Sequence, residues 1–352
     1  MSQITIKDIA RMANVSITAV SLALNNKPGI STETKEKILR IAQEYGYVHK
    51  SLRSDPVPVQ DKSKVIHFVA CTNQGIIIEH FEQLPFFTKL INHISDYLFS
   101  KGYSMMITPI NLDNLYEEMK QFSEKNGRGG VLLLGTDLTQ QQISFIARHQ
   151  PNIVVLDTCF ETLNVDFVNM NSVLGAYQAA KYLISLGHRR IGYVESNVRI
   201  RNFELRKEGF LAALREHGIQ MLEHDYFSVI PTIFTSSQEN LKREILKRKH
   251  DMPTALFCES DYIAISVIKS LIELDIKVPD DISVIGFDNI HEASIITPEL
   301  TTVHVYADRM ASLAVDRIIE LMEDRSYGYK MKYIVDTDIY ERNSCRPPAK
   351  SK

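Results

Sequence analysis

Short apolar runs alternate with helical stretches between residues 65 and 287, and this alternation constrains the fold more than any other feature. Runs that suit buried strands lie at 65–71, 105–110, 130–134, 153–156, 191–195, 226–230, 254–258 and 282–287. Stretches with helical periodicity separate them, at 85–101, 114–125, 140–149, 172–186, 204–217, 237–249 and 262–274. Apolar strands that alternate with helices are typical of parallel sheets covered on both faces. The two successive sets therefore predict an α/β core of two doubly wound parallel-sheet lobes.

The boundaries of the lobes depend on the segments near the end of the chain. A helix at about 308–322 and a strand at about 333–338 come after both sets and are available to complete the lobes by crossing back between them. We expect a core at 65–346, with a first lobe of about 65–160 plus 290–322 and a second of about 161–289 plus 323–346. Ligands of such folds bind at the carboxyl ends of the strands, here in the cleft between the lobes.

Residues 5–25 predict two short helices joined by a tight turn. Thr5 and Ser16 are side-chain caps, one before each helix. Apolar faces are formed by Ile6, Ile9, Ala10 and Ala13 in the first helix and by Ala19, Val20, Ala23 and Leu24 in the second. Asn14 suits the turn, because asparagine tolerates a left-handed backbone. This pattern is a helix-turn-helix, which places its second helix in the major groove of DNA.

A third helix and a linker come after this motif. Residues 25–29 form a turn, Ser31 or Thr32 caps a helix that runs to about Tyr45, and Gly46 stops it. We expect an all-helical head at 1–48. Residues 49–64 are polar, lack periodicity and contain two prolines, as a linker or hinge does.

Composition and charge agree with this division. The chain has 352 residues, of which 44% are hydrophobic and 24% charged, enough for two or three domains with packed cores. Residues 1–54 contain eight Lys or Arg and four acidic residues, a balance of +4, whereas the remainder carries −7. A basic head on an acidic body fits one nucleic-acid-binding module attached to a part that does not bind nucleic acid.

The sequence contains none of the common signals for a disulfide frame, a metal or a membrane. Four widely spaced cysteines, without a CxxC or Cys/His cluster, indicate free thiols in a reducing compartment and neither disulfides nor a zinc site. No run approaches 18 apolar residues and the N-terminus has no apolar signal region, so we expect a cytoplasmic protein without membrane contact. No cofactor or metal is expected.

Several phrases, taken in order, resemble the lactose-repressor/galactose-repressor family of bacterial transcription regulators over almost the whole chain. The head carries 5–10 (TIKDIA) and 15–21 (VSITAVS). The core carries 85–87 (PFF), 187–193 (GHRRIGY), 206–210 (RKEGF), 261–264 (DYIA), 278–288 (VPDDISVIGFD) and 298–303 (PELTTV).

The resemblance implies a core of periplasmic-binding-protein type with three crossings between the lobes. It also implies a homodimer, or a tetramer, that binds a pseudo-palindromic operator in double-stranded DNA. A small effector, usually a sugar or its phosphate, would bind in the cleft, and cleft closure would change the spacing of two heads. We expect a repressor of carbohydrate metabolism genes.

The second helix supplies the candidates for base contact, because its early exposed residues enter the groove. These candidates are Ile17, Thr18, Ser21 and Leu22. Relatives often have Arg where this chain has Leu22, which removes a bidentate guanine contact; packing against the third helix is the alternative role of Leu22. We interpret a further group as caps and phosphate contacts: Thr5, Lys7, Ser16, Asn25 and Ser31.

The linker departs from the resemblance. Relatives have a short hinge helix with a leucine that wedges into the minor groove. Pro56 stands where that leucine is expected and Pro58 comes soon after, so we predict a missing, shortened or displaced hinge helix. Leu52 is a substitute wedge or a plain linker residue, and Arg53 lies beside it.

Seven residues are candidates for effector contact: Phe86, Phe87, Asp157, Asn171, Arg206, Asp261 and Asp288. Asp261 comes just after a buried strand and matches a family ligand contact, with helix capping as its alternative role. Arg206 matches a family arginine, with a surface ion pair as the alternative. Phe86 and Phe87 offer rings to a sugar face or pack in the core.

Two other functional classes share this two-lobe pattern. A solute-binding protein would not need the head and would need an export signal. A sugar-processing enzyme would need a catalytic set, and the sequence has no HExxH, GxxxxGK[ST] or GxGxxG motif in a suitable context. His188 follows Gly187 at a predicted helix end, where basic residues favour the helix dipole, and we interpret it as structural.

Overall fold

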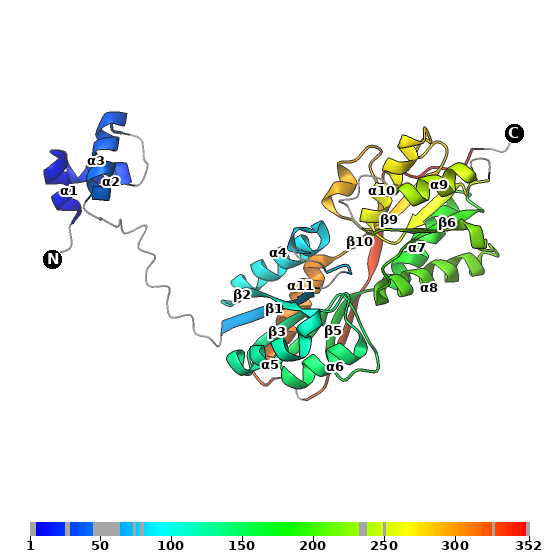
Figure 1. Cartoon of the computed structure of the whole chain (residues 1–352), viewed down its shortest axis with the longest axis horizontal. Helices are drawn as coiled ribbons and strands as arrows, with labels where there is room; N and C mark the ends of the chain where they lie inside the picture. Colours follow the sequence, from blue (N-terminus) through cyan, green and yellow to red (C-terminus); the bar gives the residue numbers. More distant parts are fainter. Residues whose placement is uncertain are drawn as a thin grey trace. The chain divides into compact units, whose positions relative to one another are not determined.

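The computed structural model describes residues 5–24, 29–44, 64–72, 75–77, 81–231, 238–248, 251–325 and 328–349 (Figure 1). The chain divides into two compact units, Met1–Lys62 and Ser63–Lys352, and each is a separate body. The predicted linker at 49–64 falls outside the described residues except for Lys64.

The described residues of the first unit form three helices, as predicted. These are α1 (Ile6–Ala13), α2 (Ile17–Leu24) and α3 (Thr32–Glu44). They enclose a small core of Ile9, Ala10, Ala13, Val20, Ala23, Ile38 and Ala42. Because this core is small, the ends of the helices contribute much of the local order.

The caps of the head lie where the sequence predicts them. Thr5 and Asp8 form a capping box, in which the Asp8 carboxylate accepts from Thr5 N at 2.9 Å. Ser16 Oγ accepts from Ala19 N at 3.1 Å at the start of α2. Ser31 Oγ accepts from Thr34 N at 3.2 Å at the start of α3. Asn14 ends α1 with φ 56°, in the left-handed region.

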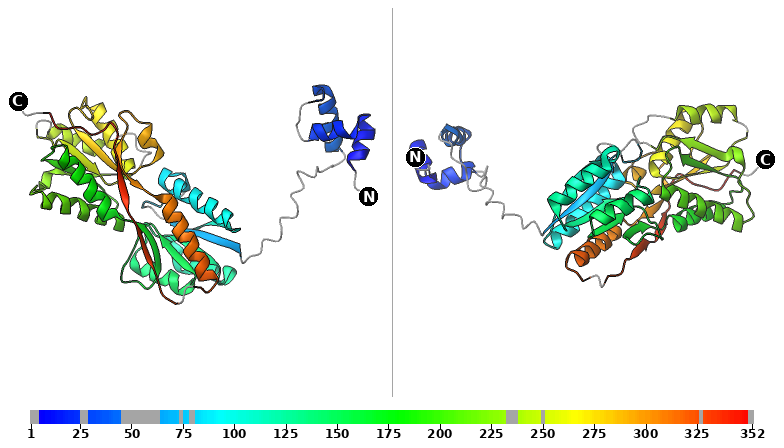
Figure 2. Two further views of the ribbon diagram at one scale, coloured as in Figure 1. Left: turned by 180° about the vertical axis from the view of Figure 1, so that it is seen from behind. Right: turned by 60° about the horizontal axis from the view of Figure 1, so that its bottom comes forward.

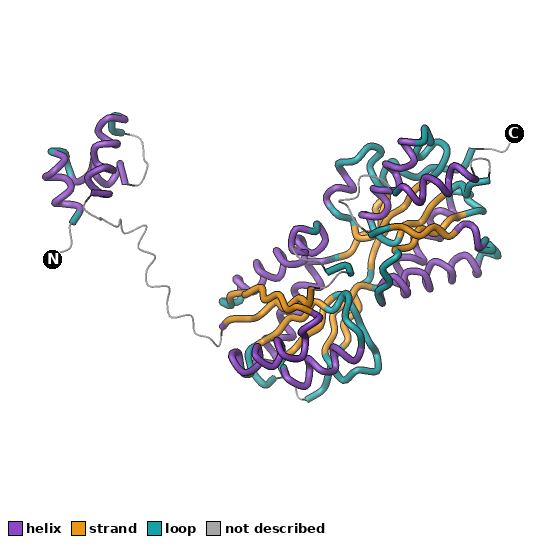
Figure 3. Tube along the Cα trace, viewed as in Figure 1, coloured by secondary structure: helices purple, strands orange, loops and turns teal. Residues whose placement is uncertain are grey.

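The described part of the second unit contains two six-stranded sheets, one in each lobe (Figures 1 and 3). The first is parallel throughout, with the order β11 (Lys332–Val335), β5 (Asp166–Met170), β4 (Ile153–Leu156), β3 (Gly130–Leu134), β1 (Val65–Thr72) and β2 (Ser104–Asn111). The second has the order β12 (Thr337–Tyr340), β10 (Thr301–Val305), β9 (Ser283–Asp288), β8 (Ala255–Cys258), β6 (Ile191–Ser196) and β7 (Tyr226–Val229). In this second sheet β12 is antiparallel to β10, and the other pairs are parallel.

Helices cover both faces of each sheet (Figure 3). In the first lobe, α4 (Pro85–Ser100) and α11 (Ala307–Met322) lie side by side on one face, and α5 (Leu115–Asn126) and α6 (Gln140–His149) cover the other (Figure 2). In the second, α7 (Ser172–Ser185) packs closely on α8 (Arg201–Glu216), and α9 (Glu239–Lys247) packs beside α10 (Asp261–Glu273). Short 3-10 turns lie at Phe81–Gln83, Leu112–Asn114, Glu223–Asp225 and His291–Ser294. This is the predicted doubly wound arrangement.

Within the described ranges the chain crosses between the sheets three times. Asn171 lies between β5 and α7, Tyr306 between β10 and α11, and Asp336 between β11 and β12. These three short connections hold the lobes together and leave the carboxyl ends of the strands facing the cleft.

The predicted boundaries of the lobes are wrong in three places. The segment 166–170, predicted in the second lobe, pairs in the first sheet, and 301–305, predicted in the first lobe, pairs in the second. The single strand predicted at 333–338 is two strands in different sheets, separated at Asp336. Strand pairing joins residues far apart in the chain, so a local apolar pattern predicts a strand without predicting its sheet.

Candidate functional site

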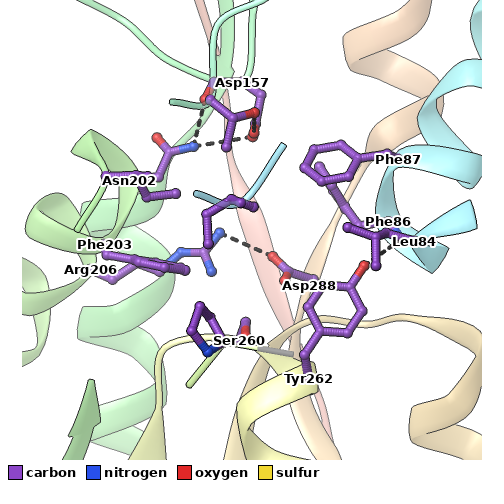
Figure 4. A pocket seen from close by; sticks show the side chains of 14 residues that line it. Leu84, Phe86, Phe87, Asp157, Asn202, Phe203, Arg206, Ser260, Tyr262 and Asp288 are labelled. Atoms are coloured by element: carbon purple, nitrogen blue, oxygen red, sulfur yellow. Dashed lines mark hydrogen bonds and ion pairs between the residues drawn. The ribbon is translucent and has the colours of Figure 1, made fainter. Parts of the chain in front are cut away.

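A cavity lies between the two lobes of the core (Figure 4). It holds about 540 Å³ of space free of protein atoms, part of it open to solvent. The first lobe contributes Ile76, Leu84, Phe86, Phe87, Thr136 and Asp157. The second contributes Ile200, Asn202, Phe203, Arg206, Pro231, Ser260, Tyr262 and Asp288. The cavity therefore combines a largely apolar wall with a few buried polar groups.

Asp157 follows the end of β4 and adopts φ 62°, a left-handed backbone uncommon outside glycine and asparagine. Its Oδ2 accepts from the Thr136 hydroxyl, and its Oδ1 accepts from Asn202 Nδ2 at 3.1 Å. The same Nδ2 donates to the Asp157 backbone oxygen at 2.9 Å. Burial raises the pKa of Asp157 to about 7. Burial thus favours the protonated form of a carboxyl that both lobes contact.

Arg206 and Asp288 form a buried ion pair on the second-lobe side. Arg206 Nη2 donates to Asp288 Oδ1 at 3.0 Å, and Nη1 donates to the backbone oxygen of Glu259. The guanidinium also lies over the Phe287 ring, 3.7 Å from its centroid. Burial raises the pKa of Asp288 to about 6, against the opposing effect of Arg206. Because the charge of Arg206 is compensated, the cavity has no net surplus of positive charge.

The Arg206 side chain retains one donor. Its Nε–H is buried and has no hydrogen-bond partner among the residues that the structure describes. Arg206 is only 3% exposed, so this donor faces protein or a bound molecule and not bulk solvent.

Four aromatic residues form much of the apolar wall: Phe86, Phe87, Phe203 and Tyr262. The Phe86 and Phe87 rings meet edge to face, with centroids 5.5 Å apart. Both residues lie in the cavity wall and also belong to the buried core, so contact with a ligand stays a prediction for them. Aromatic faces in a polar cavity suit a ligand that has an apolar side as well as hydroxyl groups.

Asp261 does not line the cavity, contrary to the prediction. It is fully buried behind Ser260 and Tyr262, where its Oδ2 accepts from Ile290 N at 2.9 Å and its Oδ1 from the Thr302 hydroxyl at 2.6 Å. Gly286 makes room for it, because a Cβ there would lie 2.2 Å from Asp261 Oδ1. Capping, the alternative considered for Asp261, belongs to Ser260, whose hydroxyl accepts from Ile263 N.

Asn171 also lies outside the cavity. It caps α7, accepting from Leu174 N at 3.1 Å. Its Nδ2 donates to Asp336 Oδ1 at 2.8 Å, and its backbone N donates to Val335 O at 2.7 Å. The side chain therefore joins the first crossing between the lobes to the third, and Asn171 is part of the hinge and not of the ligand site.

The polar segment around 199–202 has no role predicted from the sequence, and the structure gives its residues different ones. Asn202 is 2% exposed and joins the lobes, since it also accepts from Asn169 Nδ2 at 2.9 Å. Arg199 binds both carboxylate oxygens of the buried Glu259, which precedes the cavity residue Ser260. The polar character of the segment is a signal in the sequence, but the partners of Asn202 are too distant in the chain to be found from it.

The residues of the head that are predicted to contact DNA differ in their exposure to solvent. Lys7, Ile17 and Thr18 are exposed, whereas Ser21 and Leu22 are half-buried. Leu22 packs near the turn before α3, since a Cβ on Gly29 would lie 3.3 Å from Leu22 Cδ1. The packing role considered for Leu22 thus agrees with its position.

Other predicted residues of the head act as caps or lie beyond the described residues. Thr5, Ser16 and Ser31 each cap a helix. Predictions about Asn25, Leu52, Arg53, Pro56 and Pro58 lie outside the described residues.

Other chemical features of the described chain are few. The four cysteines are free. Among the described residues no group of three or more His, Cys, Asp and Glu side chains is arranged to hold a metal. The helices that are described include none long and apolar enough to span a membrane. His188 has a structural role, because its ring nitrogens contact Thr254 Oγ1 at 2.8 Å and the Arg346 backbone oxygen at 3.0 Å.

Comparison with known proteins gives two family matches. Residues 5–49 match the model of bacterial regulatory proteins, lacI family, and residues 180–345 match that of a periplasmic binding protein-like domain.

Two curated relatives are similar over nearly the whole chain. The HTH-type transcriptional repressor PurR of Pasteurella multocida is 30% identical, with 92% of this chain and 93% of that protein covered. The Ribose operon repressor of Haemophilus influenzae is 29% identical, with 95% and 97% covered. Among solved structures, the lac repressor dimer bound to operator and the anti-inducer ONPF has a TM-score of 0.68 at 19% identity, with 98% of this chain and all of that chain covered.

The buried carboxyl of Asp157 makes the free energy of unfolding depend on pH. Its pKa is raised by burial from 3.8 to about 7, so the folded state binds this proton more tightly than the unfolded state. The stability of the core should therefore fall as pH rises from about 4 to about 7, and level off above that. We expect Asp157→Asn to reduce this fall, measured by urea unfolding between pH 5 and pH 8. The exposed Asp96→Asn is the control, and equal pH profiles for the two variants would contradict the assignment.

Proposed function

The chain belongs to the lacI family of bacterial regulatory proteins, and we propose that it is a repressor whose affinity for an operator depends on a small sugar-type effector held in the cavity between its lobes. The observation that carries this proposal is the cavity at the carboxyl ends of the strands, which combines aromatic rings with buried donors and acceptors from both lobes. Effector and operator would then prefer different arrangements of the lobes.

The charge balance favours an uncharged, polyhydroxylated effector over its phosphate. The one arginine that lines the cavity in the described chain already pairs with Asp288, and Asp157 adds an acidic group. A phosphate would need an uncompensated cation or several free backbone donors. Sugar hydroxyls, in contrast, are able to donate to Asp157, while a ring face packs on Phe86, Phe87 or Phe203. The name of the ribose operon relative agrees with this ligand class.

The head supplies the contact with DNA. Ile17 and Thr18 are exposed at the start of α2 and suit contacts with thymine methyl groups and base edges. Lys7 is exposed on α1 and suits a phosphate. This surface is unusually apolar for one that contacts DNA bases. Much of the affinity for the operator should therefore come from phosphate contacts and from the second copy of the head.

We infer that the core forms a homodimer through the open edge of the first sheet. β2 is an edge strand whose Met106 and Ile107 are 50% and 42% exposed, and Phe99 near the end of α4 is 83% exposed. Exposed apolar side chains on an open edge are typical of an interface with another chain. A pseudo-palindromic operator has two half-sites and therefore requires two heads, so we assign a second copy of this chain as the partner at this edge. A bacterial operator also implies that the protein acts in the cytoplasm.

The effector proposal predicts a specific role for Arg206. Thermal unfolding in the presence of neutral pentoses and hexoses, their phosphates and nucleosides should reveal a stabilising ligand among the neutral sugars. Arg206→Gln should abolish the shift in melting temperature, because Asp288 in the cavity wall would be left buried without its partner. The exposed Arg309→Gln should keep the shift. A shift with sugar phosphates alone would overturn the neutral-sugar assignment.

The DNA proposal predicts different effects for two kinds of head residue. Lys7→Ala should weaken binding of all genomic fragments about equally and reduce its salt dependence, whereas Thr18→Ala should change which fragments bind best. Gel shifts over a fragment library at several salt concentrations measure both effects. Complete absence of salt-sensitive binding by the unaltered protein would favour a solute-binding protein or an enzyme of the same fold.

The dimer proposal predicts that charge on the open edge separates the subunits. Phe99→Glu combined with Met106→Glu should shift the full-length protein from dimer to monomer in analytical ultracentrifugation. The control is Tyr116→Glu. Tyr116 is 65% exposed on α5, and α5 covers the face of the first sheet that is opposite to the face covered by α4. If both variants remain dimeric, the interface lies elsewhere.

A further inference from the structure

Helix α4 begins at the cavity without a cap of its own. Its N-cap residue, Leu84, has no side chain able to accept a hydrogen bond, and Pro85 at the first position has no N–H. The first bond internal to the helix is from Thr88 N to Leu84 O, at 2.9 Å. Phe86 N is therefore the first backbone donor of α4 that needs an acceptor from outside the helix.

The opposite lobe supplies that acceptor. The Tyr262 hydroxyl, at the start of α10, accepts from Phe86 N at 2.9 Å across the cavity (Figure 4). Both residues are buried, with Tyr262 9% and Phe86 6% exposed. A buried helix terminus in one lobe is thus completed by a side chain from the other.

This bond requires the lobes to be close together. Phe86 is attached to the first sheet through α4, and Tyr262 to the second through α10, which is the next element after β8. The lobes are joined at the described crossings, Asn171, Tyr306 and Asp336, and a hydrogen bond of 2.9 Å tolerates little separation of the lobes. Opening of the cleft would leave Phe86 N without this acceptor.

We propose that Tyr262 is a positioning residue that favours the closed lobes by capping α4 from the opposite side of the cleft. This role goes beyond effector binding, since it operates in the protein without a ligand. A molecule that fills the cavity would pack against the Tyr262 ring. It would therefore bind to the closed arrangement of the lobes, which Tyr262 already stabilises.

Asn202 provides a comparison within the same cavity. It also joins the lobes, through Asp157 and Asn169, but Asp157 also accepts from Thr136 of the first lobe and Asn169 is part of β5. Tyr262 differs because the first turn of α4 depends on it. Loss of the Tyr262 hydroxyl should therefore destabilise the first turn of α4 directly. It should affect the rest of the cavity indirectly, because the two lobes would separate more often.

Hydrogen–deuterium exchange of the full-length protein without effector tests the proposal. Tyr262→Phe keeps the ring and removes the hydroxyl. We expect exchange to rise about 5- to 100-fold at the amide of Phe86, the scale for a buried donor that loses its partner. We also expect faster exchange on the far side of the cavity, at 157–159 and 200–202, because the lobes open more often.

Tyr97→Phe is the matched control. Tyr97 lies on the same helix, and its hydroxyl donates to Asp316 of α11 inside the first lobe, at 3.1 Å. This variant should leave exchange at Phe86 and at the far side of the cavity unchanged. No change at Phe86 in Tyr262→Phe would overturn the cross-lobe cap. A rise confined to Phe86 would show a cap without influence on closure and would also overturn the proposal. Neither result depends on the identity of the effector.

Discussion

The buried pair of Arg206 and Asp288 is the interaction on which the cavity depends. A guanidinium that is 3% exposed is tolerated only where a carboxylate and further acceptors compensate its charge. Here the compensation comes from Asp288 at the end of β9 and from the Glu259 carbonyl after β8, while the Phe287 ring covers the guanidinium. One side chain of α8 thereby fixes the ends of two neighbouring strands. These polar groups of the second lobe are therefore paired with one another in the protein without a ligand.

The polar contacts between the lobes are weaker and more local than this buried pair. Asn202 contacts Asp157 and Asn169, and Tyr262 contacts Phe86, each through hydrogen bonds of about 3 Å. Asn171 and Asp336 join two of the crossings at the hinge. A net contribution of roughly 1 kcal/mol for each such bond is small compared with the packed core of either lobe. Buried apolar packing also continues from one lobe to the other, so the mutual arrangement of the lobes depends on this packing together with a few polar contacts.

Local patterns in the sequence predict a large part of this structure. The alternation of strands and helices, the caps at Thr5, Ser16 and Ser31, and the positions of Asp157 and Asp288 at strand ends follow from neighbours in the chain. The errors concern distant partners. Asp261 turns toward the sheet because Gly286, far along the chain, leaves space for it, and strand 166–170 joins the first sheet through pairing with Ile153–Leu156 and Lys332–Val335. Tyr262 belongs to a family-like phrase in the sequence, but its contact with Phe86 spans 176 positions.

The same cavity contains groups that oppose closure. Burial raises the pKa of Asp157 to about 7 and of Asp288 to about 6, so their ionised forms are less favourable in the closed cleft than in water. The cross-lobe hydrogen bonds act in the other direction. When the two contributions nearly balance, the open and closed arrangements differ by little free energy, and a ligand that replaces water around these carboxyls needs only a modest differential affinity to change their populations. Buried acids and cross-lobe hydrogen bonds therefore act in opposite directions on the closure of the cleft.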